Sequence, residues 1–210
     1  NLAAAAAATG ATLIHISTDY VFDGRAHTPY TEQAPTAPLS VYGRTKLAGE
    51  KAIAEAGCAA LILRTAWLYS EFGNNFVKTM LRLTAQTPRV KVVFDQAGTP
   101  TYAADLAGAI HRMISSGAYR GNEGTYHFSN EGVCSWYDFA HEIAVLAGLD
   151  PARVIPCHSE EFPSPVERPR YSVLDKTKIK ETFNLTIPYW RDALERCLER
   201  LGAQTAGTAI

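Results

Sequence analysis

A tyrosine and a lysine four residues apart give the first indication of chemistry in this sequence. Tyr42 and Lys46 occur in a stretch of helix-forming residues, and a spacing of four puts both side chains on one face of a helix. A phenol ordinarily ionises near pH 10, but an ammonium group held nearby favours the phenolate and makes the phenol a better acid. Such a pair could donate a proton to a carbonyl oxygen while a hydride reaches the carbon. Alone, the spacing is weak evidence, because many exposed helices contain it by chance.

A second group of polar residues follows the first strand-like run. The segment 17–24 reads STDYVFDG and comes directly after the apolar run 11–17. In an open parallel sheet, ligands bind beyond the carboxyl ends of the strands. Thr18 is therefore predicted to lie where its hydroxyl could hydrogen-bond a carbonyl group beside Tyr42. Without Tyr42 and Lys46, the same segment would be typical of an ordinary polar turn.

The elements that must position these groups alternate between strand-like and helix-like patterns. Short apolar runs that predict strands stand at 11–17, 59–64 and 90–94, and helical spacing of apolar or helix-forming residues stands at 40–56, 75–86 and 101–116. This alternation predicts an α/β fold with a doubly wound, Rossmann-like parallel sheet that carries helices on both faces.

The pattern changes after residue 121. A short strand at 126–128 precedes a helix with Ser135 as its predicted N-cap and Asp138 three residues further on, close to a capping box. A proline-rich loop at 156–169 and a final helix at 188–201 follow. We expect residues 1–120 to form the nucleotide-binding part with the catalytic residues. We expect residues 121–210 to form mainly a smaller substrate-binding lobe, with the chain crossing between the two.

Composition narrows the classes of function. The chain has 210 residues, 47% of them hydrophobic, and 20 Lys and Arg balance 21 Asp and Glu. A balanced charge argues against nucleic acid as a partner, and no apolar run approaches the ~18 residues of a membrane span. No signal peptide is visible, and the four cysteines lack metal-ligand spacing. We therefore expect a cytoplasmic, soluble protein with reduced thiols and no membrane partner.

Thr18, Tyr42 and Lys46 together resemble the catalytic triad of the extended short-chain dehydrogenases/reductases. The resemblance is closest to the dTDP-4-dehydrorhamnose reductases, whose sequence blocks occur here in the same order over nearly the whole chain. These blocks are STDYVFDG, VYGRTKLAGE, LRTAWLY, GNNFVKTMLRL, VVFDQAGTPTYAADLA, GTYHFSN, SWYDFAHEIA and RPRYSVLD.

The resemblance implies a reaction. Members of this family reduce the C4 keto group of dTDP-4-dehydro-L-rhamnose to dTDP-L-rhamnose with NADPH or NADH, a step in cell-surface polysaccharide biosynthesis. Carried over to this sequence, Tyr42 is the general acid and Thr18 orients the keto oxygen. Lys46 assists Tyr42 and holds the nicotinamide ribose.

The resemblance also implies a wider set of binding residues. The expected cofactor-binding residues are Ser17, Tyr42, Lys46, Thr65 and Ala66. The expected substrate-binding residues are Thr18, Asp19, Tyr20, Trp67, Asn75, Gln96 and Thr101. The substrate partner is a nucleotide-sugar, and the resemblance allows a homodimer. Some relatives are described with Mg²⁺ at a subunit contact, but no metal ligands are assigned in this sequence.

One feature of the family is absent from the sequence. No glycine-rich dinucleotide fingerprint follows a first strand. The chain opens on Asn1-Leu2 and six alanines that end at Gly10, as if inside a helix. We therefore expect an N-terminally truncated sequence that lacks the first strands and the phosphate cradle. As given, we expect the chain to bind cofactor poorly and to be inactive.

Two other functions share these residues. A related nucleotide-sugar epimerase or dehydratase would also carry the Tyr42 and Lys46 pair, although the blocks STDYVFDG and GNNFVKTMLRL favour the reductase. A non-catalytic, NADP-binding regulatory subunit of methionine adenosyltransferase could keep the same triad without turnover. The sequence leaves both alternatives open.

Overall fold

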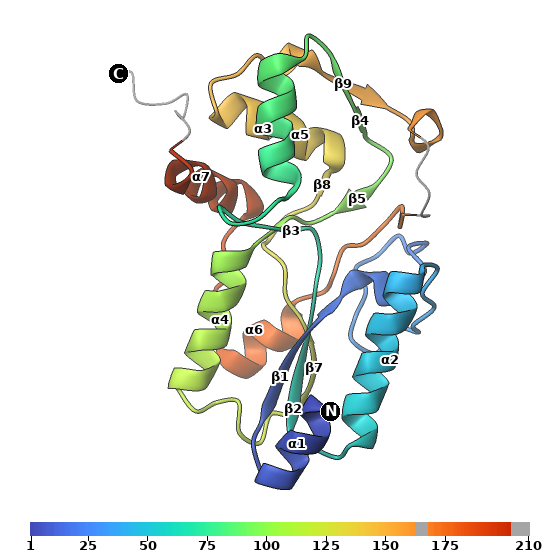
Figure 1. Ribbon diagram of the computed structural model, residues 1–210, viewed down its shortest axis with the longest axis vertical. Helices are drawn as coiled ribbons and strands as arrows, with labels where there is room; N and C mark the ends of the chain where they lie inside the picture. Colours follow the sequence, from blue (N-terminus) through green and yellow to red (C-terminus); the bar gives the residue numbers. More distant parts are fainter. Residues whose placement is uncertain (163–167, 203–210) are drawn as a thin grey trace.

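The computed structural model describes residues 1–162 and 168–202. One half of the molecule, at the bottom of Figure 1, is built on a parallel sheet in the order β1-β2-β7. Its strands are β1 (Leu13–Thr18), β2 (Ala60–Thr65) and β7 (Gly124–His127). The helices of this half are α1 (Leu2–Thr9), α2 (Val41–Glu55), α4 (Ala103–Ser115) and α6 (Thr177–Phe183).

Side chains of β2 divide between the two faces of this sheet. Leu61 and Leu63 pack into a core with residues of α4 and α6, whereas Ala60 and Ile62 pack against residues of α1 and α2. This alternation follows from the two-residue period of a strand, and the whole of β2 is buried because helices cover both faces. The predicted parallel sheet with helices on both sides is confirmed.

The other half of the molecule has its own core. Its helices are α3 (Phe76–Gln86), α5 (Trp136–Leu146) and α7 (Trp190–Arg200), and its parallel strands are β4 (Val90–Val93) and β9 (Val154–Cys157). Four shorter strands complete the described part of the chain: β3 (Leu68–Tyr69), β5 (Ala97–Gly98), β6 (Thr101–Tyr102) and β8 (Cys134–Ser135).

The strand predicted at 90–94 forms, but it does not extend the main sheet. It is β4, and it pairs with β9, because the preceding helix α3 packs on α5 rather than on the main sheet. The third strand of the main sheet is β7 instead. Elements from either side of residue 120 therefore occur in both halves, and the division at that residue stays a prediction.

Local signals place the helix ends. Gly10 ends α1 with a left-handed φ of 69°, as predicted for a C-cap glycine. The capping box of α5 is present: the Ser135 hydroxyl accepts a hydrogen bond from the amide of Asp138, whose carboxylate accepts one from the Ser135 amide. The loop predicted at 156–169 includes only the last two residues of β9, and residues 163–167 lie outside the described part.

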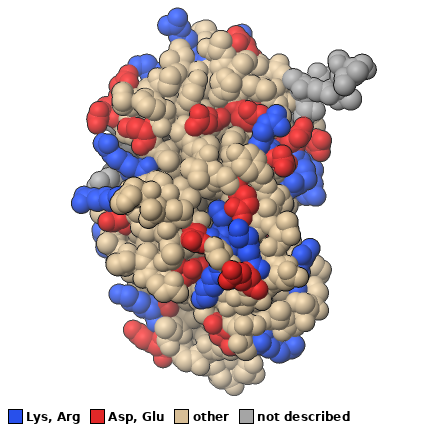
Figure 2. All heavy atoms as spheres, turned by 180° about the vertical axis from the view of Figure 1, so that it is seen from behind, with Lys and Arg blue, Asp and Glu red and all other residues tan. Residues whose placement is uncertain are grey.

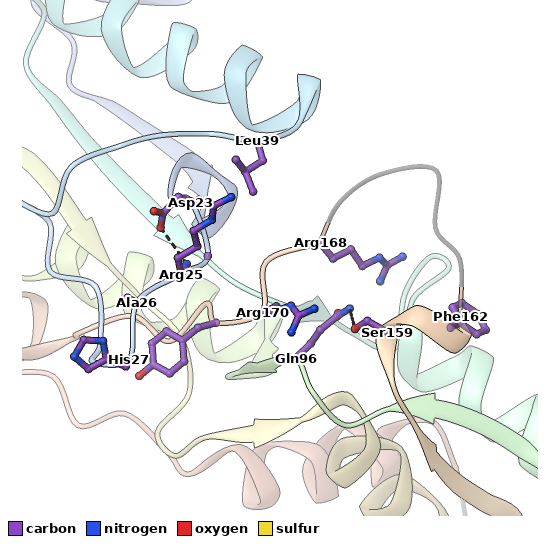
Figure 3. Close-up of a pocket in the computed structure, with 12 residues that line it drawn as sticks. Asp23, Arg25, Ala26, His27, Leu39, Gln96, Ser159, Phe162, Arg168 and Arg170 are labelled. Carbon is purple, nitrogen blue, oxygen red and sulfur yellow. Dashed lines mark hydrogen bonds between the residues drawn. The ribbon is translucent and has the colours of Figure 1, made fainter.

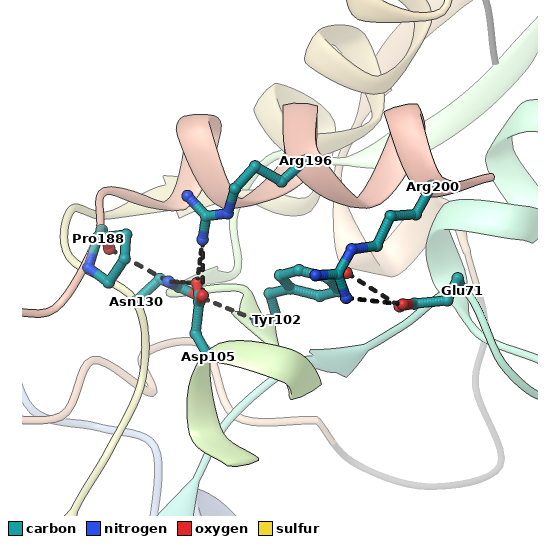
Figure 4. A network of polar contacts seen from close by, with 7 residues as sticks. All are labelled: Glu71, Tyr102, Asp105, Asn130, Pro188, Arg196 and Arg200. Atoms are coloured by element: carbon teal, nitrogen blue, oxygen red, sulfur yellow. Dashed lines mark hydrogen bonds and ion pairs between the residues drawn. The ribbon is translucent and has the colours of Figure 1, made fainter. Parts of the chain in front are cut away.

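Polar contacts join the two halves where α7 crosses α4 (Figure 4). The Arg196 guanidinium of α7 lies 2.6 Å from the Asp105 carboxylate of α4. Asn130 also donates a hydrogen bond to Asp105, at 2.7 Å. One turn along α7, Arg200 lies 3.2 Å from Glu71, which accepts a second hydrogen bond from the Tyr102 hydroxyl. These contacts fix the relative orientation of the two halves at the N-terminal end of α4.

Surface charge follows the balanced composition. On the face shown in Figure 2, basic side chains are interspersed with acidic ones rather than gathered in one large area. All four cysteines are free. Within residues 1–162 and 168–202, no helix combines the length and the apolar character that crossing a bilayer requires.

Candidate active site

A cavity of about 670 Å³ opens where β1 and β2 end and α2 begins. Thr18, Tyr42 and Lys46, which the sequence analysis singled out, all line it. The remaining lining residues are Ile16, Ser17, Asp19, Tyr20, Thr65, Ala66, Trp67, Leu68 and Arg168. The cavity thus collects every residue expected to bind the cofactor, together with four of those expected to bind the substrate.

Three expected substrate-binding residues lie elsewhere. Asn75 caps α3, because its side chain accepts a hydrogen bond from the amide of Lys78. Thr101 is fully buried behind the cavity and its hydroxyl lies 3.3 Å from that of Thr65. Gln96 lines a neighbouring cavity. Asn75 and Thr101 therefore support neighbouring backbone and side chains in this structure, whereas Gln96 forms part of a cavity wall.

The turn after β1 positions an acid beside the Thr18 hydroxyl. The Thr18 hydroxyl accepts a hydrogen bond from the amide of Tyr20 and donates one of 2.9 Å to the Asp19 carboxylate. Asp19 is only 3% exposed. Burial raises the pKa of its carboxyl group to about 6, although the nearby hydroxyl groups of Thr18 and Ser172 act in the opposite direction. The cavity therefore contains a carboxyl group whose protonated form persists to a higher pH than that of an ordinary aspartate, up to about 6.

Helix α2 presents three side chains of successive turns to the sheet. Tyr42 lies at the cavity mouth, 53% exposed, with its ring edge-to-face against Tyr20 at 5.6 Å. Lys46, one turn later, donates a hydrogen bond to the Ile16 carbonyl of β1. Glu50, one further turn along, is buried. Tyr42 and Lys46 thus lie on one face of the helix, as their spacing predicts, and this face is turned towards the end of β1.

Glu50 forms a buried ion pair that the sequence analysis did not anticipate. Its carboxylate receives two N–H groups of Arg64 in β2, the shorter contact being 2.7 Å. The Ser17 hydroxyl of β1 donates to the same carboxylate. The sequence did contain a signal for this pair: Arg64 ends the apolar run 59–64, and a cation in a buried strand requires an acidic partner. The pair ties α2, β1 and β2 together beneath the cavity.

Trp67 connects the cavity to the other half of the molecule. Its backbone has a φ of 48°, which is uncommon for a bulky residue. Its indole stacks on Trp136 of α5 with ring centroids 3.6 Å apart. The indole also packs so closely on Gly98 that a Cβ atom at position 98 would lie 2.6 Å from the Trp67 ring. Trp67 is therefore held between two elements of the second half.

A second cavity of about 840 Å³ adjoins the first, and Arg168 lines both. Arg25, His27 and Arg170 add further basic groups to it (Figure 3). The Gln96 amide donates a hydrogen bond to Ser159, at 2.9 Å. Its buried carbonyl oxygen has no partner among the described residues. This basic cavity is suited to an anionic ligand.

No group of three or more His, Cys, Asp or Glu side chains able to hold a metal ion occurs in the part of the chain that the structure describes. The described residues therefore give no support for the Mg²⁺ that the resemblance raised.

Comparisons with known proteins give consistent results. Residues 1–203 match the family described as RmlD substrate binding domain. A probable dTDP-4,6-dihydroxy-2-methyloxan-3-one 4-ketoreductase of Streptomyces antibioticus is 46% identical over 87% of this chain, and a dTDP-4-dehydrorhamnose reductase of Mycolicibacterium smegmatis is 43% identical over 99%. The chain spans 61% and 63% of the lengths of these two proteins.

Solved structures agree with this match. The crystal structure of a dTDP-4-dehydrorhamnose reductase from Bacillus anthracis in complex with NADP is 41% identical to this chain. It superimposes with a TM-score of 0.89 over 95% of this chain and 69% of that one.

Gly43 tests how closely α2 must approach the turn after β1. A Cβ atom at this position would lie 2.2 Å from the Tyr20 carbonyl oxygen, whereas at Gly49 of the same helix the nearest atom is 4.0 Å away. We expect Gly43→Ala to lower the free energy of unfolding by about 1–3 kcal/mol because backbone must shift. Gly49→Ala should raise it by up to about 1 kcal/mol. Urea unfolding measures both, and equal effects would contradict the close approach.

Glu50→Ala tests the buried ion pair. The substitution leaves the Arg64 charge buried without its partner, so we expect the free energy of unfolding to fall by about 3–5 kcal/mol. The double variant Glu50→Leu/Arg64→Met should lose less than the single one, because neither charge remains. Glu160→Ala, which removes an exposed ion pair with Arg170, serves as the control and should leave the unfolding midpoint unchanged. A double variant less stable than Glu50→Ala would refute this account.

Proposed function

The chain belongs to the RmlD substrate-binding domain family, and given this membership we propose that its protein reduces dTDP-4-dehydro-L-rhamnose to dTDP-L-rhamnose with NAD(P)H. The observation that carries the proposal is the single cavity shared by Thr18, Tyr42 and Lys46. A hydroxyl, a phenol and an ammonium group at one site are the groups that carbonyl reduction requires.

The proposed reaction needs a proton donor at the keto oxygen. As the carbonyl carbon gains a hydride, negative charge develops on its oxygen, and paired donors lower the energy of that charge. Tyr42 gives its phenolic proton to this oxygen, and the Thr18 hydroxyl is the second donor. Tyr42 lies at the cavity mouth, so solvent can return its proton after each turnover.

The cavity residues fit the nicotinamide end of a cofactor. When bound, the nicotinamide supplies the hydride. The Lys46 ammonium has three N–H donors, and its one hydrogen bond among the described residues goes to the Ile16 carbonyl. Its other donors are available for ribose hydroxyl groups. Ser17, Thr65 and Ala66 line the same cavity and would contact the nicotinamide. A relative in complex with NADP supports NADPH as the form used here.

The two adjoining cavities suggest how a nucleotide-sugar would bind. The sugar would lie in the first cavity against Asp19, Tyr20 and Trp67. The diphosphate would lie on Arg168 and Arg170, since guanidinium groups bind phosphate oxygens in pairs. Gln96 lines the second cavity and would lie beside the nucleoside.

A second candidate substrate is another dTDP-linked keto sugar. The Streptomyces antibioticus relative is named for reduction of dTDP-4,6-dihydroxy-2-methyloxan-3-one and is 46% identical to this chain. The same three groups would carry out this reduction, so the two candidates differ in the sugar contacts alone.

Tyr42→Phe tests the proton donor. In the complete protein that contains these 210 residues, we expect kcat to fall about 10²–10⁴-fold, because general acid catalysis contributes roughly that factor. The KM for sugar nucleotide should change little. NADPH and NADH oxidation with dTDP-4-dehydrorhamnose measures both constants. Turnover equal to wild type would remove Tyr42 from the mechanism, and tight NADP(H) binding without turnover in the wild type would favour a regulatory protein.

Lys46→Met tests the cofactor contact. We expect a higher KM for NADPH and a lower kcat, since both the ribose contact and the charge beside the phenol are lost. Lys51→Met is the matched control, because Lys51 is an exposed residue of the same helix that does not line the cavity. A change in thermal stability alone, with unchanged kinetic constants, would assign Lys46 a structural role.

A further inference from the structure

Asp19 carries a buried carboxyl group beside Thr18, and a contact with the substrate would not by itself explain why an acid is buried there. Its carboxylate accepts the hydrogen bond of the Thr18 hydroxyl, and its second oxygen has no hydrogen-bond partner among the described residues. None of the ion pairs of the described residues includes it. Burying a carboxylate without a cation is costly, and a protonated carboxyl group avoids that cost.

The direction of the Thr18 hydrogen bond matters for the reaction. A threonine hydroxyl has a single proton to donate, and in this structure that proton goes to Asp19. Hydrogen bonds to a charged acceptor are about twice as strong as those to a neutral one. An ionised Asp19 therefore competes with the neutral keto oxygen for the Thr18 proton, and the carboxylate holds it.

We propose that Asp19 works in its protonated form as a positioning residue, donating its own proton to the Thr18 oxygen so that the Thr18 hydroxyl turns to the keto oxygen. This inference rests on the proposed function of the cavity. In this arrangement the Thr18 oxygen accepts from Asp19 and from the Tyr20 amide and donates to the substrate. All of its hydrogen-bonding capacity is then used.

The surroundings of Asp19 favour the protonated form. The titratable and charged groups that line the cavity with it are Tyr20 of its own turn, Tyr42 and Lys46 of α2, and Arg168 of the neighbouring loop. The charges of Glu50 and Arg64, beneath the cavity, are paired with each other. The Lys46 ammonium is held at the Ile16 carbonyl, and Arg168 is exposed. With no cation among the described residues bound to Asp19, burial dominates and its pKa rises to about 6.

The proton balance of the reaction is unchanged by this role. The hydride forms the new C–H bond, and the Tyr42 proton forms the O–H bond of the product alcohol. Tyr42 then regains a proton from solvent. Asp19 keeps its proton throughout and determines only which way the Thr18 hydroxyl points. Its protonated state is present below the raised pKa and is lost as the pH rises through it.

The pH dependence of kcat/KM tests the proposal on the complete protein. For the wild type, we expect kcat/KM with dTDP-4-dehydrorhamnose to fall as the pH rises from about 5 to about 8 through a value near 6. In Asp19→Asn the side-chain amide donates to the Thr18 oxygen at every pH. The ratio of kcat/KM for D19N to that for wild type should therefore rise about tenfold per pH unit above this value.

Two further variants separate positioning from a purely structural role. In Asp19→Ala, Thr18 has neither a competing carboxylate nor a donor beside it. The kcat/KM of this variant should therefore no longer fall with pH, but it should stay below that of D19N because nothing orients the Thr18 hydroxyl. In a Thr18→Val background, adding Asp19→Asn should no longer change the pH profile, because there is no hydroxyl to orient. Carboxyl carbon NMR on the wild type, with D19N to assign the signal, reads the titration of Asp19 without any turnover.

Several results would overturn the proposal. A D19N-to-wild-type ratio that is constant over this pH range, or a pH difference that persists in the Thr18→Val background, would refute the role through Thr18. A carboxyl signal that titrates near 4, the ordinary value for aspartate, would refute the protonated state. Absence of wild-type turnover on the sugar nucleotide would overturn the proposed function and this role together, whereas turnover with an unchanged ratio would overturn this role alone.

Discussion

The buried pair of Glu50 and Arg64 is the contact on which the arrangement of the cavity depends. Removing two charges from water costs several kcal/mol per ion, and only good geometry with further hydrogen bonds offsets it. Here the guanidinium binds the carboxylate through two N–H groups, and the Ser17 hydroxyl adds a third donor. The pair joins α2, β1 and β2, so these three elements have one relative register.

That register brings the reactive groups together. Lys46 is one helical turn before Glu50 and Tyr42 one turn before Lys46, so the position of the ion pair along β1 determines where both side chains meet the sheet. Thr18 follows Ser17 directly, at the carboxyl end of β1. A hydroxyl, a phenol and an ammonium group from distant parts of the sequence thus reach one cavity through a contact that takes no part in the chemistry.

The opposite wall of the cavity depends on the second half of the molecule. Trp67 follows β2 but packs on Trp136 of α5 and against Gly98. Helix α7 contacts α4 through Asp105 and the segment after β3 through Glu71 (Figure 4). The two halves therefore contribute different properties: the sheet half supplies hydroxyl, phenol and ammonium groups, and the other half supplies aromatic surface. Under the proposed function, the sugar ring of the substrate would lie between these two walls.

Features that depend on near neighbours were predictable from the order of residues alone. The capping box at Ser135 and Asp138, the end of α1 at Gly10 and the shared face of Tyr42 and Lys46 all follow from spacings of a few residues. The position of Thr18 was predictable as well, because parallel strands present their carboxyl ends at one edge.

Other features emerged only from the folded chain. These are the pairing of β4 with β9, the placement of Asn75 and Thr101 away from the cavity, and the partner of Arg64. Strand order and ion pairing are settled by packing between residues far apart in the chain, which local periodicity does not encode.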